Sequence, residues 1–207
     1  TGLTYGLSAM LQSPHFLYRT EYGDGGDRLT DFELASRMSF LLWNTIPDED
    51  LLDAAAAGEL SSSSGRRAQA QRMLADSRWS DGLRAIFSDV FALYELDHLD
   101  KDPNVFANAS SSLGPAAREE TLAVIEDLVI TQNTDFTELM TTRRTFVDRN
   151  LAALYEVPAP AFDGFAPTEL PNDGRRRGLL GHASVLSLHA HAVRSSAARS
   201  CKTVSGS

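Results

Sequence analysis

The chain has 207 residues, of which 28 are acidic and 19 are basic, so its formal net charge is −9 at pH 7. Apolar side chains make up 43% of the sequence and charged ones 23%, a balance typical of globular proteins and too apolar for a disordered acidic tail. The negative charge argues against a nucleic-acid partner, because binding phosphates requires clustered positive charge. No stretch approaches the roughly 20 apolar residues that span a bilayer, so we expect no membrane span.

The chain begins with Thr1 and contains a single cysteine, Cys201. Because the first residue is not Met, we expect the sequence to come from a longer precursor, and the lack of a leader does not argue for a cytoplasmic location. A lone cysteine forms no internal disulfide, and it cannot supply the Cys-x-x-Cys-His motif to which c-type haem is attached. We therefore expect no cofactor within this chain.

The sequence predicts a helix over residues 31–43. Thr30 and Glu33 have the spacing of a capping box, in which each side chain accepts a hydrogen bond from the other residue's backbone amide. Apolar residues then recur on one face at helical spacing: Leu34, Met38, Leu41 and Leu42.

More helices are expected further along the chain. Acidic residues after Pro47 favour a helix start, and Gly58 is a natural stop for the same helix. Pro115 begins another helix, in which Thr121 and Val124 face inward. An apolar stripe at helical spacing predicts a core helix between these two: Trp79, Leu83, Ile86, Phe87, Val90 and Tyr94. Shorter helices are expected around residues 66–74, 135–140 and 148–155, with at most a brief extended piece over 145–147.

The segment from Val157 to Gly174 carries four prolines, which remove amide donors and restrict the preceding residue. It is predicted as a loop or linker and is the best candidate for a domain boundary. The apolar run after Leu179 fits a helix, which we favour, or a strand with a period of two. Since no series of alternating strands appears elsewhere, the predicted fold class is mostly α, a multi-helix bundle-like domain followed by a truncated second helical segment.

Five segments together are similar to one protein family. In chain order they are residues 13–19 (SPHFLYR), 29–43 (LTDFELASRMSFLLW), 47–52 (PDEDLL), 145–151 (TFVDRNL) and 177–186 (RGLLGHASVL). Their order and spacing resemble the planctomycete-type, cytochrome-c-associated domains of unknown function. After His191 the chain departs from the family pattern, because Ser-Ser-Ala and Arg-Ser-Cys-Lys stand where the family shows Thr-Ser-Pro and Arg-Gly-Lys.

The resemblance implies three parts of the chain. These are the tail of a preceding small helical domain (1–22), the fourth planctomycete-specific domain (28–157) and the truncated start of the third cytochrome-associated domain (177–207). The Pro-rich linker predicted from the prolines (158–176) lies between the last two. It implies a non-catalytic helical module of a larger exported bacterial protein, periplasmic or extracellular. The implied partners are neighbouring domains of the same polypeptide, among them a cytochrome c module that carries c-type haem outside this chain.

Three histidines near the end of the chain are candidate metal ligands. His182 and His189 are seven residues apart and share a face of a continuous helix, whereas His189 and His191 share a face only on a strand. Neutral imidazole is the commonest metal ligand in proteins. The alternative is polar histidines at a helix end, where the positive form suits the helix dipole.

The alternative function is a metal-dependent enzyme that combines these histidines with a helix carboxylate, Glu119 or Glu120. Glu119 with Glu126, and Glu120 with Asp127, lie seven residues apart on the predicted helix, so each pair shares a face. Paired carboxylates perform acid–base chemistry or bind metals. On an acidic protein they more often line a solvated helix face, which is what we expect here. The catalytic residues stay unknown.

A further alternative is a carbohydrate-binding surface. Phe162 and Phe165 lie in the Pro-rich segment, where we expect aromatic side chains to be exposed. Trp43 and Trp79 fall on apolar helix faces instead, and we expect them in the core.

Overall fold

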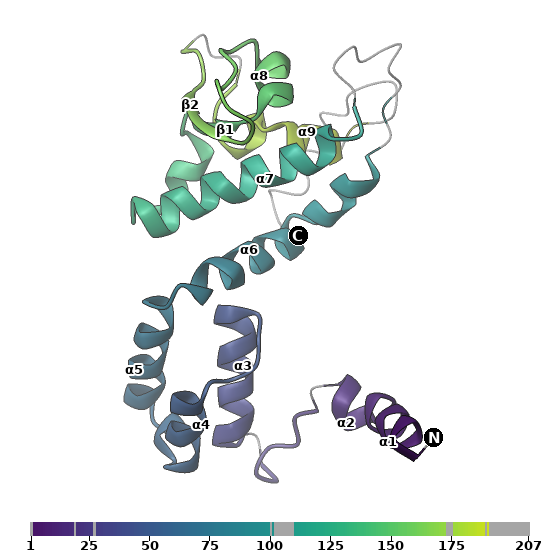
Figure 1. Cartoon of the computed structure of the whole chain (residues 1–207). Coiled ribbons are helices and arrows are strands. Elements are labelled where there is room, and N and C mark those ends of the chain that lie inside the picture. The colour runs from purple at the N-terminus through teal and green to yellow at the C-terminus, as the bar shows by residue number, and fades with distance from the viewer. Residues whose placement is uncertain are drawn as a thin grey trace. The chain divides into compact units, whose positions relative to one another are not determined.

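The computed structural model describes residues 2–18, 20–26, 28–99, 101, 110–172, 176–188 and 190. Their secondary structure is mostly helical with one small two-stranded sheet, which confirms the predicted fold class (Figure 1). By their own contacts the residues divide into two compact units, Thr1–Gly82 and Leu83–Ser207. Among the described residues, no helix is long and apolar enough to cross a membrane.

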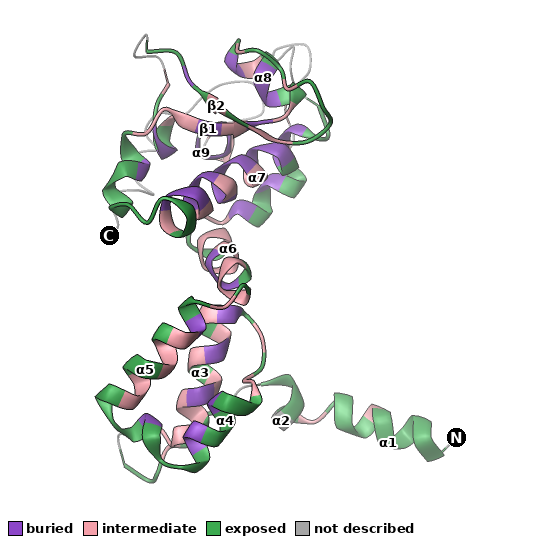
Figure 2. Ribbon diagram, turned by 60° about the vertical axis from the view of Figure 1, so that its left-hand side comes forward, coloured by how far each residue is buried: buried purple, intermediate pink, exposed green. Residues whose placement is uncertain are grey.

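The first unit is made of helices. In chain order they are α1 (Gly2–Leu11), α2 (Pro14–Leu17), α3 (Asp31–Trp43), α4 (Glu49–Ala56) and α5 (Ser63–Leu74), and the unit boundary falls within α6 (Arg78–Val90). Helix α3 packs against α4 and α5 around a common core of Ala35, Trp43, Leu51, Ala54, Ala55, Leu60 and Met73. Helix α1, by contrast, has no buried residue, as its colouring in Figure 2 shows.

The capping box predicted at the start of α3 is confirmed. The Thr30 hydroxyl accepts a hydrogen bond from the Glu33 amide at 3.3 Å, and the Glu33 carboxylate accepts one from the Thr30 amide at 2.8 Å. The same carboxylate also accepts from the amides of Tyr22 and Gly23, at 2.6 and 3.1 Å. Because these bonds favour the charged form, they lower the pKa of Glu33 to about 2.

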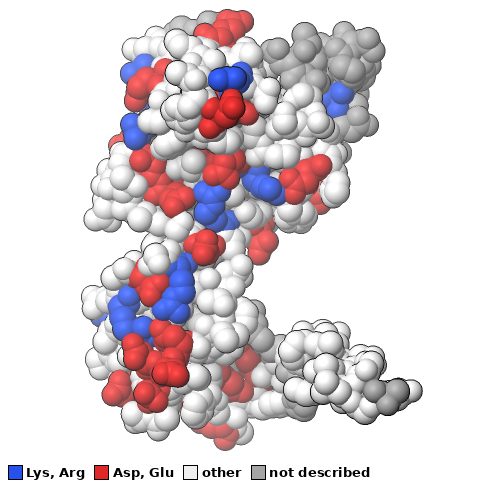
Figure 3. Space-filling view, viewed as in Figure 1, with Lys and Arg blue, Asp and Glu red and all other residues white. Residues whose placement is uncertain are grey.

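Trp43 lies in the core of the first unit, as expected. Its Nε1 donates to the Met73 carbonyl oxygen at 2.9 Å, and the Arg78 guanidinium lies 3.4 Å from the ring centroid. Arg72 and Arg78 both pair with Asp48, the N-cap residue of α4, and the Arg72 hydrogen bonds lower the pKa of that carboxyl. Figure 3 shows such acidic and basic side chains next to one another on the surface of this unit.

The second unit is built around α7 (Leu113–Glu126), which a π-helical turn extends over Asp127–Thr131. Strand β1 (Arg144–Val147) contacts α7 and pairs antiparallel with β2 (Ala166–Glu169). Helices α8 (Arg149–Tyr155) and α9 (Ala183–Leu188) also pack against α7. The unit also includes three 3₁₀ helices among its described residues, over Leu93–His98, Phe136–Met140 and Leu179–Gly181.

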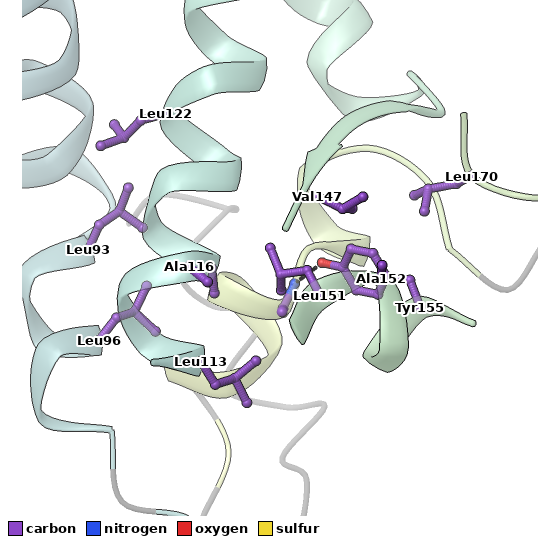
Figure 4. Packing of buried hydrophobic residues seen from close by; sticks show 12 residues of the cluster. Leu93, Leu96, Leu113, Ala116, Leu122, Val147, Leu151, Ala152, Tyr155 and Leu170 are labelled. Atoms are coloured by element: carbon purple, nitrogen blue, oxygen red, sulfur yellow. Dashed lines mark hydrogen bonds between the residues drawn. The ribbon is translucent and has the colours of Figure 1, made fainter. Parts of the chain in front are cut away.

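Leucine, alanine and valine side chains from these elements, together with one tyrosine, form the core of the second unit (Figure 4). The buried members are Leu93, Leu96, Leu113, Ala116, Ala117, Leu122, Val147, Leu151, Ala152, Tyr155, Leu170 and Ala183. Because they come from both sides of the Pro-rich segment, the residues before and after this segment share one core.

The apolar stripe predicted through Val90 and Tyr94 is wrong at its C-terminal end. Helix α6 ends at Val90, and Ala92 has a φ of 51°, so the chain leaves the helix before Tyr94. Val90 is 61% exposed and Tyr94 53% exposed. Leu93 and Leu96 of the following 3₁₀ helix are buried in their place.

The Pro-rich segment contains structure beyond the predicted loop. Strand β2 lies within it, with Pro167 opposite Phe146, and a proline is tolerated there because each strand of a two-stranded sheet is an edge strand. Leu170, the residue directly after β2, is buried. After the segment, α9 is a helix, as we favoured, and not a strand. Residues 28–157, predicted as one domain, contribute to both compact units, and the sequence-based boundaries stay a prediction.

Candidate functional site

The second unit contains a buried set of polar side chains, which we call the Glu120 network. Its members come from α7, β1, α8 and the residues around the start of α9: Glu120, Thr121, Thr145, Tyr155, His182 and Ser184. Tyr155 is 6% exposed and every other member at most 1%. Helical spacing places Glu120 and Thr121 on the same side of α7 as the buried Ala117 and Val124, which explains why they face the interior.

Glu120 accepts a hydrogen bond at each carboxylate oxygen. The Thr145 hydroxyl donates to Oε1 at 2.6 Å, and the Tyr155 hydroxyl donates to Oε2 at 2.6 Å. The Tyr155 oxygen in turn accepts the backbone N–H of Ala183 at 2.7 Å, so its own hydrogen is left for Glu120 (Figure 4). Tyr155 therefore connects α7 to the first residue of α9.

Two influences keep the Tyr155 phenol protonated. Burial raises the pKa of Tyr155, and the neighbouring Glu120 carboxylate raises this pKa further. The Arg176 guanidinium, 4.9 Å from the centre of the phenol ring, acts in the opposite direction with a smaller effect. A protonated phenol is the form that can donate to Glu120.

His182 lies in the second half of the network. Its Nδ1 is 3.1 Å from the Thr121 hydroxyl oxygen, which also lies 2.6 Å from the Ser184 hydroxyl and 3.2 Å from the Ala117 carbonyl oxygen. One arrangement of hydrogens satisfies these contacts: Thr121 donates to Ala117 and accepts from Ser184 and from His182 Nδ1–H. Burial lowers the pKa of His182, against a smaller opposing effect of Glu120, so the ring is neutral at pH 7.

The network satisfies its own polar groups. Within the described part of the chain, no buried side-chain nitrogen or oxygen lacks a hydrogen-bond partner. Fully paired networks of this kind fix the relative positions of the elements that contribute to them. Chemically, this arrangement holds α7, β1, α8 and α9 together.

The structure places one of the three predicted metal ligands. His182 is buried in the Glu120 network, with Nδ1 next to Thr121. His189 and His191 lie outside the described residues, so the three-histidine site stays a prediction. In the described ranges, no group of three or more His, Cys, Asp or Glu side chains is arranged to hold a metal ion.

The expectation of a solvated face for the paired helix carboxylates is wrong for one pair. Glu120 is 0% exposed, because it faces the buried donors Thr145 of β1 and Tyr155 of α8. Asp127, in the π-helical turn, is 8% exposed and accepts hydrogen bonds from Arg144 of β1. Glu119 and Glu126 are partly exposed, and both pair with Arg84 of α6. The four carboxylates therefore divide into a buried and a surface pair.

The two aromatic residues proposed for carbohydrate binding are in different environments. Phe162 is 58% exposed, whereas Phe165 packs against the core of the second unit. A flat binding surface formed by both rings would require Phe165 to leave that core.

Sequence reasoning missed Tyr155 and Ser184 as members of the network, and it placed Thr145 only in a brief extended piece. The sequence of α7 does indicate that Glu120 is buried. Glu120 stands three residues after Ala117 and next to Thr121, which is predicted to face inward, so helical spacing places it on the same side. A carboxylate at such a position requires buried donors. The sequence gives no indication of which distant residues provide them.

Comparison with known proteins places the chain in a family. No curated protein and no solved structure matches it. The family model described as PSD4, a protein of unknown function (DUF1592), matches residues 29–157, more than half of the chain. This finding supports the planctomycete-specific part of the resemblance and gives no support to the cytochrome-associated part. The chain therefore belongs to the PSD4 family of proteins of unknown function.

Proposed function

We propose that this chain is a non-catalytic helical module of a larger exported bacterial protein, in which it supports neighbouring c-type cytochrome modules. In this role the module holds the beginning of the next domain against the PSD4 segment. Membership of the PSD4 family supports the assignment as a module. The proposed cytochrome partner and the exported location rest on the resemblance of residues 177–186 to a cytochrome-associated domain.

The contacts of Tyr155 carry the proposal. Tyr155 and Glu120 lie within the residues that match PSD4, and Ala183 lies in the segment that follows the Pro-rich stretch. The phenolic oxygen is 2.6 Å from Glu120 Oε2 and 2.7 Å from the Ala183 nitrogen. Three side chains of types that could take part in catalysis are used here for structural contacts: a carboxylate, a phenol and an imidazole. Their engagement in holding two segments together favours a supporting role over catalysis.

Co-purification tests the proposed partner. The natural polypeptide that carries this sequence, tagged and isolated from its cells, is expected to retain a c-type haem domain or protein, detected by the peroxidase activity of covalent haem in denaturing gels. Haem bound covalently to the same polypeptide stays with every variant. Where the haem is carried by a separate protein, a Tyr155→Phe variant is expected to retain less of it, because it loses the hydroxyl that joins Glu120 to Ala183. The matched variant Tyr94→Phe changes an exposed tyrosine of the same unit and is expected to behave as the wild type. Preparations without any haem-bearing domain or partner would contradict the proposal.

Elemental analysis of the same preparations separates the module from the metal-dependent enzyme. A stoichiometric metal that disappears in His189→Ala, together with loss of an activity, would replace the proposed module by an enzyme. Wild-type protein and His189→Ala with the same metal content and the same haem retention are the results that the module predicts.

A further inference from the structure

A pocket of about 410 Å³ lies in the second unit beside Tyr155. Its walls come from α8, the end of the Pro-rich segment, the 3₁₀ helix before α9 and α9 itself: Leu154, Tyr155, Glu156, Leu170, Pro171, Arg176, Leu180, Gly181 and Leu186. The volume falls within the range of small-molecule sites, about 300–1,000 Å³. At about 30 Å³ for each water-sized group, it holds on the order of ten non-hydrogen atoms.

Apolar residues make up five of the nine residues that line the pocket, and polar groups share its surface. Four leucines and one proline line the pocket, and two of these leucines, Leu180 and Leu186, remain 44% and 40% exposed. Covering them with an apolar ligand would remove them from water, which is favourable in proportion to the area covered. The pocket therefore suits a ligand that combines a hydrocarbon part, placed on these two leucines, with a polar end.

Arg176 provides the polar group of the pocket. Its guanidinium lies 4.9 Å from the centre of the Tyr155 ring, and its Nη1 donates to the Gly181 carbonyl oxygen at 3.0 Å, so two contacts fix its position. Within the described part of the chain, no carboxylate lies within 4 Å of this guanidinium to form an ion pair. A guanidinium has five N–H donors arranged to match a carboxylate.

Glu156 also lines the pocket, with an exposed side chain that has a contact of its own. The selectivity of the site for an anion therefore depends on Arg176. The combination of a fixed guanidinium and exposed leucine side chains suits an anion with one charged end.

We propose that this pocket binds a small amphipathic monocarboxylate, a saturated carboxylic acid of about eight carbons, with its carboxylate on Arg176 and its chain along Leu180 and Leu186. The site is independent of the supporting role proposed above, since its walls require neither haem nor a partner. Octanoate, with ten non-hydrogen atoms at about 30 Å³ each, occupies roughly three quarters of the pocket.

Isothermal titration of the purified chain with octanoate tests the proposal. Arg176→Gln is expected to weaken octanoate binding roughly 10- to 100-fold, the usual loss of a charge-assisted hydrogen bond. Arg177→Gln alters the adjacent, exposed arginine and is expected to bind as the wild type does. The neutral isostere octanamide is expected to bind wild type and Arg176→Gln equally. Unchanged far-ultraviolet circular dichroism shows that the variants keep their fold.

A chain-length series tests the apolar wall separately. From butyrate to octanoate, affinity is expected to rise about fourfold per methylene while added groups are buried, and then to level off when the pocket is full. Leu180→Gln is expected to reduce this increment. Equal binding of octanoate to wild type and Arg176→Gln, or no binding at millimolar concentration, would overturn the proposal.

Discussion

The Tyr155 hydroxyl serves two buried groups that come from different elements. It donates to a Glu120 oxygen on α7 and accepts the N–H of Ala183 at the first residue of α9. Bulk water cannot replace the hydroxyl as the hydrogen-bond partner of either group, because Glu120 is 0% exposed and Ala183 is 3% exposed. A single oxygen atom therefore accounts for two contacts whose loss would leave a charged acceptor and a backbone donor unsatisfied.

Tyr155→Phe tests this account, since it removes the oxygen and keeps the ring. Leaving buried polar groups unpaired costs about 1–3 kcal/mol, and more where one of them is charged, so we expect unfolding free energy to fall by at least this amount. Urea unfolding followed by hydrogen exchange of α7 peptides measures the change. Tyr94→Phe, at an exposed site, is expected to stay within about 0.5 kcal/mol of wild type. A Tyr155→Phe protein as stable as this control would show that the hydroxyl contributes nothing.

Individual side chains of the network were only partly predictable. The spacing that turns Thr121 inward also turns Glu120 inward, because adjacent positions on α7 border the same buried side. The donors Thr145 and Tyr155 are 25 and 35 residues away from Glu120, and no local rule connects them. His182 was singled out as a metal ligand, yet its Nδ1 faces the Thr121 hydroxyl, a partner that only the packing of α9 against α7 could reveal.

The backbone at the start of α7 lies very close to the backbone of the preceding 3₁₀ helix, Leu93–His98. Gly114, the second residue of α7, is buried, and a Cβ atom added to it would overlap the carbonyl group of Leu96. The 3₁₀ helix Leu93–His98 packs closely against α7, and Leu96 is 0% exposed. Glycine is needed at this position for space, and not for a special backbone angle.

Gly114→Ala should therefore reverse the usual effect of this substitution in a helix. Alanine normally stabilises a helix interior by about 0.5–1 kcal/mol relative to glycine. Here the overlap with backbone atoms forces α7 and the 3₁₀ helix apart, and we expect a net loss of about 1–3 kcal/mol in urea unfolding, as for other overpacked cores. Gly6→Ala is the matched control in α1, where nothing lies within 4 Å of the added Cβ, and it is expected to raise the helical dichroism signal. A Gly114→Ala protein more stable than wild type would contradict the close approach.

The elements were most predictable where their end signals are local. The capping box of α3 and the acidic first turn of α4 are contacts between neighbours in sequence, and both are found in the structure. The end of α6 was missed because the apolar stripe continues past Val90, whereas the left-handed conformation of Ala92 redirects the chain. Strand β2 was missed because its partner β1 lies about 20 residues earlier, and its proline argued for a loop.

For the molecule as a whole, the net charge and the buried titratable groups predict that acidification lowers both solubility and stability. The net charge of −9 at pH 7 and the isoelectric point near 5.0 mean that repulsion between molecules disappears on acidification. Two sets of titrating groups then lower the free energy of unfolding in different pH ranges. His182 belongs to the second unit, and the low-pKa carboxyls Glu33 and Asp76 belong to the first.

His182 predicts a loss of stability that begins at mildly acidic pH. Its pKa is lowered in the folded protein by burial, whereas the unfolded chain has the ordinary value near 6.5. Below about pH 6.5 the unfolded state therefore binds a proton that the folded state does not, and unfolding free energy falls with pH by up to about 1.4 kcal/mol per unit until the folded pKa is reached. Glu33 and Asp76 each have a pKa of about 2 in the folded protein, whereas carboxyl groups of the unfolded chain have a pKa near 4. Their contribution to the free energy of unfolding is therefore complete above about pH 4 and is lost as the pH falls from about 4 to about 2.

Two probes separate these windows. Trp43 and Trp79 are both in the first unit, so tryptophan fluorescence reports the carboxyl window, and hydrogen exchange of α7 peptides reports the second unit. Between pH 7 and 5 we expect the exchange-derived stability of α7 to fall in wild type and to change much less with pH in His182→Gln. The exposed His98→Gln is the matched control and should keep the wild-type slope. Dilute protein limits precipitation near the isoelectric point. An unchanged slope in His182→Gln would show that the buried imidazole is not the group that makes the second unit sensitive to acid.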